Sequence, residues 1–162
     1  MKRILKFFEN DLPLVISGVA LAASVTIAVV NAILRYTISH PIPGADAIIT
    51  LCFAYTVYVG SAAAFKKGAH YGVDVFVTKF SPKNQLIIKT VLDILIFVIM
   101  CLCFGLAFKL TMNAGNKRFE GLKASYVVYD FSAVLGFAYS ILYAIEFVIS
   151  DMKKLSGKEA QT

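Results

Sequence analysis

The sequence predicts an all-α integral membrane protein with four transmembrane helices and a short amphipathic helix at the membrane interface between the second and third spans. Of its 162 residues, 59% are hydrophobic, and the mean hydropathy of +0.75 is too high for a soluble domain of this size. The apolar blocks span residues 12–34, 47–65, 86–108 and 127–150. Each can cross a hydrocarbon core about 30 Å thick, because a helix rises about 1.5 Å per residue.

The four blocks occupy most of the chain, so residues 1–162 are interpreted as a single membrane domain. The predicted transmembrane helices run over about 12–36, 46–65, 83–108 and 127–150, with the interfacial helix over about 70–80. The basic N-terminus followed by an apolar run is similar to a secretory signal. Because Glu9 and Asp11 interrupt the basic region and uncharged sequence continues to Leu34, we favour a retained helix.

Small residues recur at every fourth position of the first helix, at Ala20, Ser24, Ala28 and Ala32. This spacing lets another helix approach closely, although alanine is also simply common in membrane helices.

Two prolines and a glycine between Ser39 and Gly44 predict a turn that joins the first two helices as an antiparallel pair. Arg35 closes the first helix and Asp46 opens the second at the same membrane level, so the two can pair across the turn. Alternatively, each is solvated separately, and even a paired arrangement contributes only about 0 to 1 kcal/mol at an exposed site.

The segment after the second helix has apolar residues at i, i+3, i+4 and i+7, which is typical of an amphipathic helix on the membrane surface. These residues are Val73, Phe76, Val77 and Phe80, with His70, Asp74 and Thr78 on the other face. A strand also fits the alternating valines, but a lone strand in the interface would leave its backbone unpaired.

Ser81 and Pro82 predict the start of the third helix, as an N-cap followed by proline at the first helical position. Lys89 and Asp93 lie four residues apart within that helix, and we interpret them as a local pair rather than as part of a transport path.

Basic residues indicate the orientation. Eleven of the 16 Lys and Arg residues fall at one face if the N-terminus is cytoplasmic, which predicts that both termini are cytoplasmic. The net charge of +6 reflects this bias rather than nucleic-acid binding. The outer loop between the third and fourth helices is an exception, because Lys117, Arg118 and Lys123 make it basic. It is either a docking patch for an acidic soluble partner or a tolerated deviation.

The sequence offers no catalytic, cofactor-binding or metal-binding set. His40 and His70 lie at opposite membrane faces and cannot share a haem. Cys52, Cys101 and Cys103 all fall within apolar spans. The first span has no charge for proton coupling, and no phosphate-binding loop or nucleophile set is present. We therefore predict that the chain is not an enzyme and binds no cofactor.

Three motifs resemble the small permease subunit of TRAP (tripartite ATP-independent periplasmic) transporters, the DctQ-like family. An Arg-Tyr pair closes the first helix, an acid follows a glycine at the start of the second, and a basic-Gly-x-His-x-x-Val-Asp signature follows the second. The corresponding residues are Arg35, Tyr36, Asp46, Lys67, Gly68, His70, Val73 and Asp74. Two departures are mild: Tyr71-Gly72 follows the histidine where relatives often carry an aliphatic residue, and Asp46 is often Glu.

The resemblance implies a scaffold in the bacterial inner membrane that contacts lipids and braces a large multi-spanning permease subunit. A periplasmic substrate-binding protein would deliver the solute, an organic acid such as a C4-dicarboxylate or a sialic acid, and sodium would bind the large subunit. The candidate partner-interface residues are Arg35, Tyr36, Asp46, Lys67, Gly68, His70, Asp74 and Asp93, with Lys117, Arg118 and Lys123 as a possible outer docking patch. The alternative is a free-standing, homo-oligomeric four-helix carrier or pore in which Asp93 and Glu146 line a path.

Overall fold

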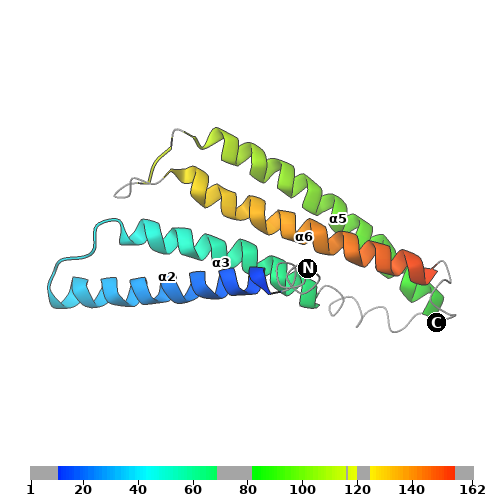
Figure 1. Ribbon diagram of the computed structural model, residues 1–162, viewed down its shortest axis with the longest axis horizontal. Coiled ribbons are helices and arrows are strands. Elements are labelled where there is room, and N and C mark those ends of the chain that lie inside the picture. The colour runs from blue at the N-terminus through cyan, green and yellow to red at the C-terminus, as the bar shows by residue number, and fades with distance from the viewer. Residues whose placement is uncertain (1–10, 69–81, 116, 120–124, 156–162) are drawn as a thin grey trace, which may run out of the picture.

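The computed structural model describes residues 11–68, 82–115, 117–119 and 125–155. This part of the chain contains four long helices (Figure 1). They are α2 (Leu12–Thr37), α3 (Ala45–Gly68), α5 (Pro82–Asn113) and α6 (Tyr126–Leu155). Each is long and apolar enough to cross a membrane, which confirms the predicted all-α membrane fold.

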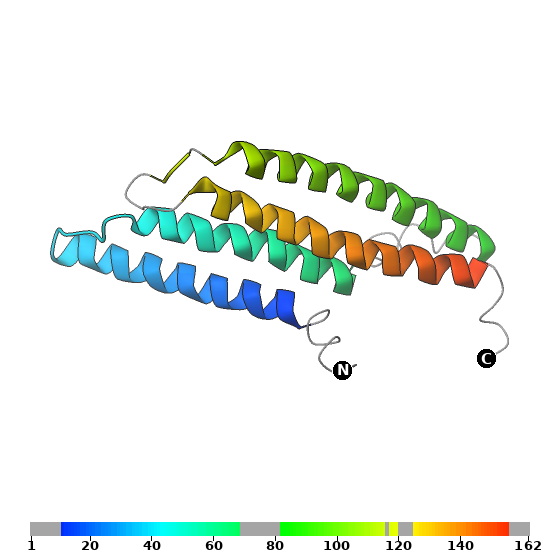
Figure 2. The ribbon, with the colours of Figure 1, turned by 45° about the horizontal axis from the view of Figure 1, so that its top comes forward.

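The four helices form an open row rather than a closed bundle. The main contacts are α2 with α3, α3 with α6, and α6 with α5 (Figure 2). The two antiparallel hairpins, α2–α3 and α5–α6, are thus joined along one seam between α3 and α6, which run in the same direction. We call the end that holds both hairpin turns the turn end, and the end where α2 begins and α6 finishes the terminal end.

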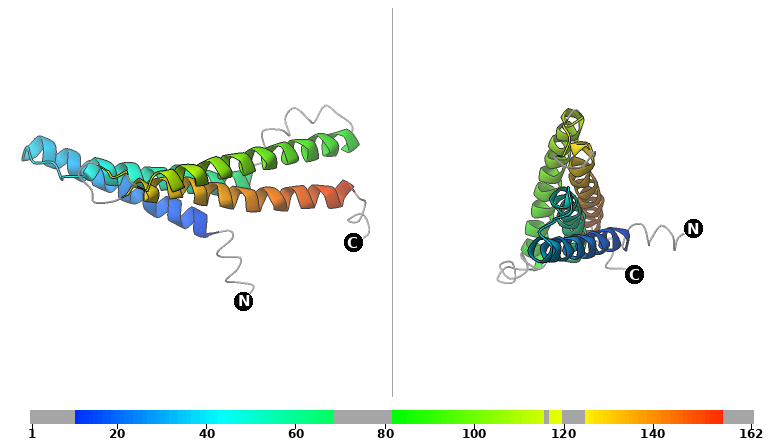
Figure 3. Two further views of the ribbon diagram at one scale, coloured as in Figure 1. Left: turned by 90° about the horizontal axis from the view of Figure 1, so that it is seen from above. Right: turned by 90° about the vertical axis from the view of Figure 1, so that its left-hand side faces the viewer.

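The core of the row lies along α6. Ala133 and Val134 on α6 are buried together with Ala107 on α5, and the rings of Tyr58 and Phe137 pack against them. Helix α5, in contrast, lies at the edge of the row and leaves most of its apolar side chains exposed. Figure 3 shows that the α5–α6 hairpin extends beyond the end of α3 at the terminal end.

The helix ends differ from the predicted ones mainly where charged residues follow an apolar block. Helix α3 continues to Gly68 rather than 65, α5 to Asn113 rather than 108, and α6 to Leu155 rather than 150. Lysines at a span end do not force the helix to stop, because their long side chains can reach the interface while the backbone stays helical. The interfacial helix predicted over 70–80 lies outside the described residues.

The face of α2 that packs on α3 follows the predicted row of small residues in part. Ser24 of that row is buried, Ala20 and Ala28 are half-buried, and Ala32 is exposed. Ser17, which is outside the row, is also buried. Each buried serine hydroxyl donates to a carbonyl of its own helix, at 3.0 Å for Ser17 and 2.9 Å for Ser24. The hydroxyls are therefore satisfied locally, and the serines serve as small residues in the contact.

Candidate functional site

The motif residues at the turn end of the first hairpin point away from the fold. Arg35 lies in the last turn of α2 and Asp46 in the first turn of α3, and both are exposed. No ion pair joins them in the described part of the chain, so the pairing expected across the turn is not formed here. Tyr36 is 87% exposed at the end of the span, where tyrosine is enriched and where its ring is open to lipid or to a partner protein.

The turn itself is held by a residue to which sequence reasoning assigned no role. Asn31 Oδ1 accepts a hydrogen bond of 2.9 Å from the backbone N–H of Ile42, eleven residues further on. Ser39 and Gly44 adopt positive φ values of 57° and 77°, which reverse the chain before α3. An asparagine in an otherwise apolar span was the available indication, because such a polar side chain needs a hydrogen-bond partner.

The seam between the hairpins is closest at Gly136 of α6. A Cβ atom placed there would lie 2.4 Å from the carbonyl oxygen of Tyr58 on α3. Ser132 and Ser140, four residues to either side of Gly136, are also buried and extend the row of small residues. Nearby, the Tyr55 hydroxyl donates to the Val128 carbonyl at 3.1 Å. This seam was not predicted, although small residues at positions 132, 136 and 140 have the required spacing.

The terminal end of the seam carries an ion pair between the hairpins. Lys66 Nζ of α3 lies 3.7 Å from Glu146 Oε2 of α6 and 4.4 Å from the centre of the Tyr143 ring, which is buried. Glu146 thus contacts α3 in this structure. The pair was missed because Lys66 and Glu146 are eighty residues apart and lie on helices whose adjacency was unknown.

The remaining candidates are Lys67, Gly68 and Asp93, which the structure describes, and His70 and Asp74, which it does not. Lys67 is exposed near the end of α3, and Gly68 is its last residue. Asp93 is buried in α5, with 5% of its surface exposed, so its side chain is not on the surface of this chain. His70 and Asp74 lie outside the described residues.

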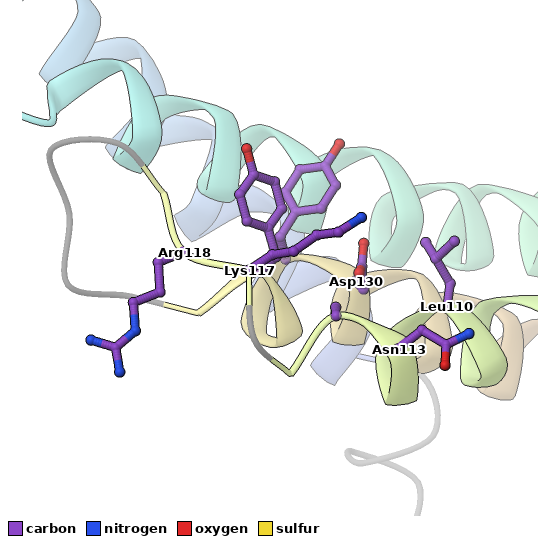
Figure 4. A pocket seen from close by; sticks show the side chains of 8 residues that line it. Leu110, Asn113, Lys117, Arg118 and Asp130 are labelled. Carbon is purple, nitrogen blue, oxygen red and sulfur yellow. The ribbon is translucent and has the colours of Figure 1, made fainter.

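A cavity of about 590 Å³ with charged and apolar lining lies at the turn end of the α5–α6 hairpin (Figure 4). Its lining includes Lys117, Arg118 and the carboxylate of Asp130. Lys117 and Arg118 are both exposed, but the Arg118 guanidinium points away from the other labelled residues. The third basic residue of the predicted patch, Lys123, lies outside the described residues.

Among the described residues, no group of three or more His, Cys, Asp or Glu side chains is placed to hold a metal ion. What the described geometry offers is therefore contact surface and a cavity lined by charged and apolar side chains.

Residues 24–154 match the family described as "Tripartite ATP-independent periplasmic transporters, DctQ component". The chain belongs to the DctQ family. Its members are components of transporters, so this DctQ chain is not an enzyme. The matched region includes all of α3 and α5, the larger part of α6 and every candidate site residue.

A Haemophilus influenzae protein named "Putative TRAP transporter small permease protein" is similar to this DctQ chain. The two are 28% identical over 98 residues, which is 60% of this chain and 61% of the relative. The alignment thus covers less than two thirds of either protein. The family match and the four helices that can span a membrane together show that this DctQ chain is a multi-pass membrane protein.

Proposed function

We propose that this chain is the scaffold of a sodium-coupled TRAP transporter that takes up an organic acid across the bacterial inner membrane. In this proposal, it braces the large permease subunit, which binds sodium and the solute. Both termini are cytoplasmic, so the turn end faces the periplasm. The distribution of Lys and Arg supports this orientation.

The observation that carries the proposal is the exposure of Arg35, Tyr36 and Asp46 at the turn end of α2–α3. None of them makes an ion pair or a side-chain hydrogen bond that holds the described fold together. Arginine and tyrosine are the residue types that most often dominate binding energy at protein interfaces. Their position supports a contact with the large subunit.

The open row of helices supports the bracing role. Helix α5 packs mainly on α6, and its outward face presents a continuous apolar surface. Because the helices form a single row, much of their apolar surface is not covered by another helix of this chain. That surface is available for contact with a larger membrane protein and with lipid.

The test is co-purification of the large permease subunit with tagged wild-type chain and with Arg35→Ala/Tyr36→Ala. We expect the double variant to retain less than about one tenth of the partner, since central arginine and tyrosine contacts often contribute 2 kcal/mol or more. Met152→Ala is the matched control, because this side chain is 56% exposed near the end of α6, outside both proposed contact surfaces.

The same preparations are then tested in vesicles for sodium-driven uptake of organic acids, with the periplasmic substrate-binding protein present. Equal recovery of the large subunit by wild type and double variant would contradict the proposed interface. Uptake by this chain alone would instead establish the free-standing carrier.

We further propose that the substrate-binding protein docks at the turn end, where Arg118 points outward. Arg118→Glu should slow association with an acidic surface, and the effect should shrink as salt is raised. A rate that is unchanged at low salt would argue against docking there.

A further inference from the structure

The turn-end cavity places opposite charges around one space. It lies between the last turn of α5, the first turns of α6, and Ala114, Lys117 and Arg118 from the segment between them. Its volume of about 590 Å³ is in the range of small-molecule sites. The lining residues are Leu110, Asn113, Ala114, Lys117, Arg118, Tyr126, Tyr129 and Asp130.

Asp130 is the buried acid of this cavity. Only 9% of its surface is exposed, although it lies in the second turn of a membrane-spanning helix. A carboxylate at this depth needs a cation or a hydrogen-bond donor nearby. Because Asp130 lines the cavity, its carboxylate favours a ligand with a positive group there.

Lys117 supplies the opposite charge. Its side chain extends toward Asp130 in Figure 4, and the two charges are close enough to interact electrostatically. They do not form an ion pair within 4.0 Å in the described structure. The Lys117 ammonium and the Asp130 carboxylate thus border the cavity without contacting each other. This arrangement suits a ligand that carries a negative group for Lys117 and a positive group for Asp130.

The position of the cavity indicates that a ligand with both charges is the headgroup of a membrane lipid. It lies where two membrane spans end, at the level of the headgroups. Tyr126 and Tyr129 border it, and tyrosine is enriched at this level of a bilayer. Leu110 and Ala114 add apolar lining beside the polar groups, as an acyl chain entering from the bilayer requires.

We propose that this cavity binds the headgroup of a phospholipid that carries a primary ammonium group and a phosphate, the phosphoethanolamine type. The ammonium donates hydrogen bonds to the Asp130 carboxylate and lies near the tyrosine rings, which attract cations. The phosphate is bound by Lys117. Arg118 points away and contributes little.

The test is native mass spectrometry of the full chain, with any co-purified subunit, from nanodiscs that hold phosphatidylethanolamine and phosphatidylglycerol in equal amounts. We expect retained phosphatidylethanolamine to exceed phosphatidylglycerol by about tenfold, because the latter lacks the ammonium. Asp130→Asn and Lys117→Gln should each lower that retention by about tenfold. Lys109→Gln is the matched control and should retain lipid as the wild type does, because Lys109 is exposed on α5 and does not line the cavity.

Additional binding measurements distinguish phosphatidylethanolamine from other ligands. Phosphatidylcholine, whose quaternary ammonium donates no hydrogen bond, should be retained less than phosphatidylethanolamine. Soluble phosphoethanolamine should not bind in place of the lipid; binding without an acyl chain would overturn the lipid assignment. Equal retention of the two test lipids, or wild-type retention by both Asp130→Asn and Lys117→Gln, would overturn the site itself. Because subunit recovery is not used as a readout, these outcomes are independent of the proposed scaffold role.

Discussion

Gly136→Ala should loosen the seam between the two hairpins. A Cβ at this position would lie 2.4 Å from the carbonyl oxygen, 2.7 Å from the carbonyl carbon and 2.9 Å from the Cβ of Tyr58. Ordinary van der Waals contact begins at 3.4 Å, so α3 and α6 must separate by about 1 Å. The obstacle is mostly backbone of the neighbouring helix, which cannot rotate away as a flexible side chain can.

The magnitude follows from two opposing terms. Overpacking a close contact costs about 1 to 3 kcal/mol, and the upper part of that range applies because backbone must move. Replacing glycine by alanine within a helix gains about 1 kcal/mol. The expected net loss in the free energy of unfolding is therefore about 1 to 2 kcal/mol. The assay is unfolding in mixed micelles by increasing SDS, followed through helical circular dichroism.

Two other glycines calibrate the result. Gly105→Ala should be neutral or slightly stabilising, because nothing lies within 4 Å of its added Cβ. Gly60→Ala should fall between the two, because its added Cβ would lie 3.2 Å from the Ser17 side chain of α2. If Gly136→Ala proved as stable as Gly105→Ala, the reasoning about the α3–α6 contact would be refuted.

Three other predictions concern the turn of the first hairpin, the ion pair between the hairpins and the orientation. Asn31→Ala should cost about 1 kcal/mol in thermal unfolding by removing the acceptor for the Ile42 N–H. Asn31→Gln, which keeps an uncharged amide acceptor, should cost less, and equal losses would exclude that bond as the cause. A double-mutant cycle on Lys66 and Glu146 should give a coupling below about 1 kcal/mol, because the side chains are 25% and 47% exposed; a coupling of several kcal/mol would contradict this. In a background without the native cysteines, Tyr36→Cys should react with a membrane-impermeant maleimide added to the periplasmic side, and reaction from the cytoplasmic side alone would reverse the proposed orientation.

Number and approximate position of the helices could be predicted because each span is a long apolar block, and the bilayer fixes how long a span must be. The ends were less predictable. Lys109 was read as the limit of the third span, yet α5 continues to Asn113. An interfacial lysine is compatible with either outcome, since its side chain can reach water from a helix.

The order of helices in space could not be predicted, because lipid-facing and protein-facing residues are both apolar. The small residues of α2 suggested a stripe at every fourth position, which the structure follows at Ser24 but not at Ala32, and Ser17 outside the stripe is also buried. The cavity at Asp130 could not be predicted either, because pairing of the third and fourth helices does not determine which of their side chains face each other.

The seam between the hairpins affects how the protein assembles in the membrane and how it is degraded. Each hairpin closes on itself through neighbouring helices, so α2–α3 can complete its own contacts in the membrane before α5 and α6 have been synthesised. Docking of α6 along α3 is then a separate, later step. Damage to that seam would separate two intact hairpins that stay joined along the chain, rather than unfold four helices, and quality control in the membrane would meet a parted protein instead of a denatured one.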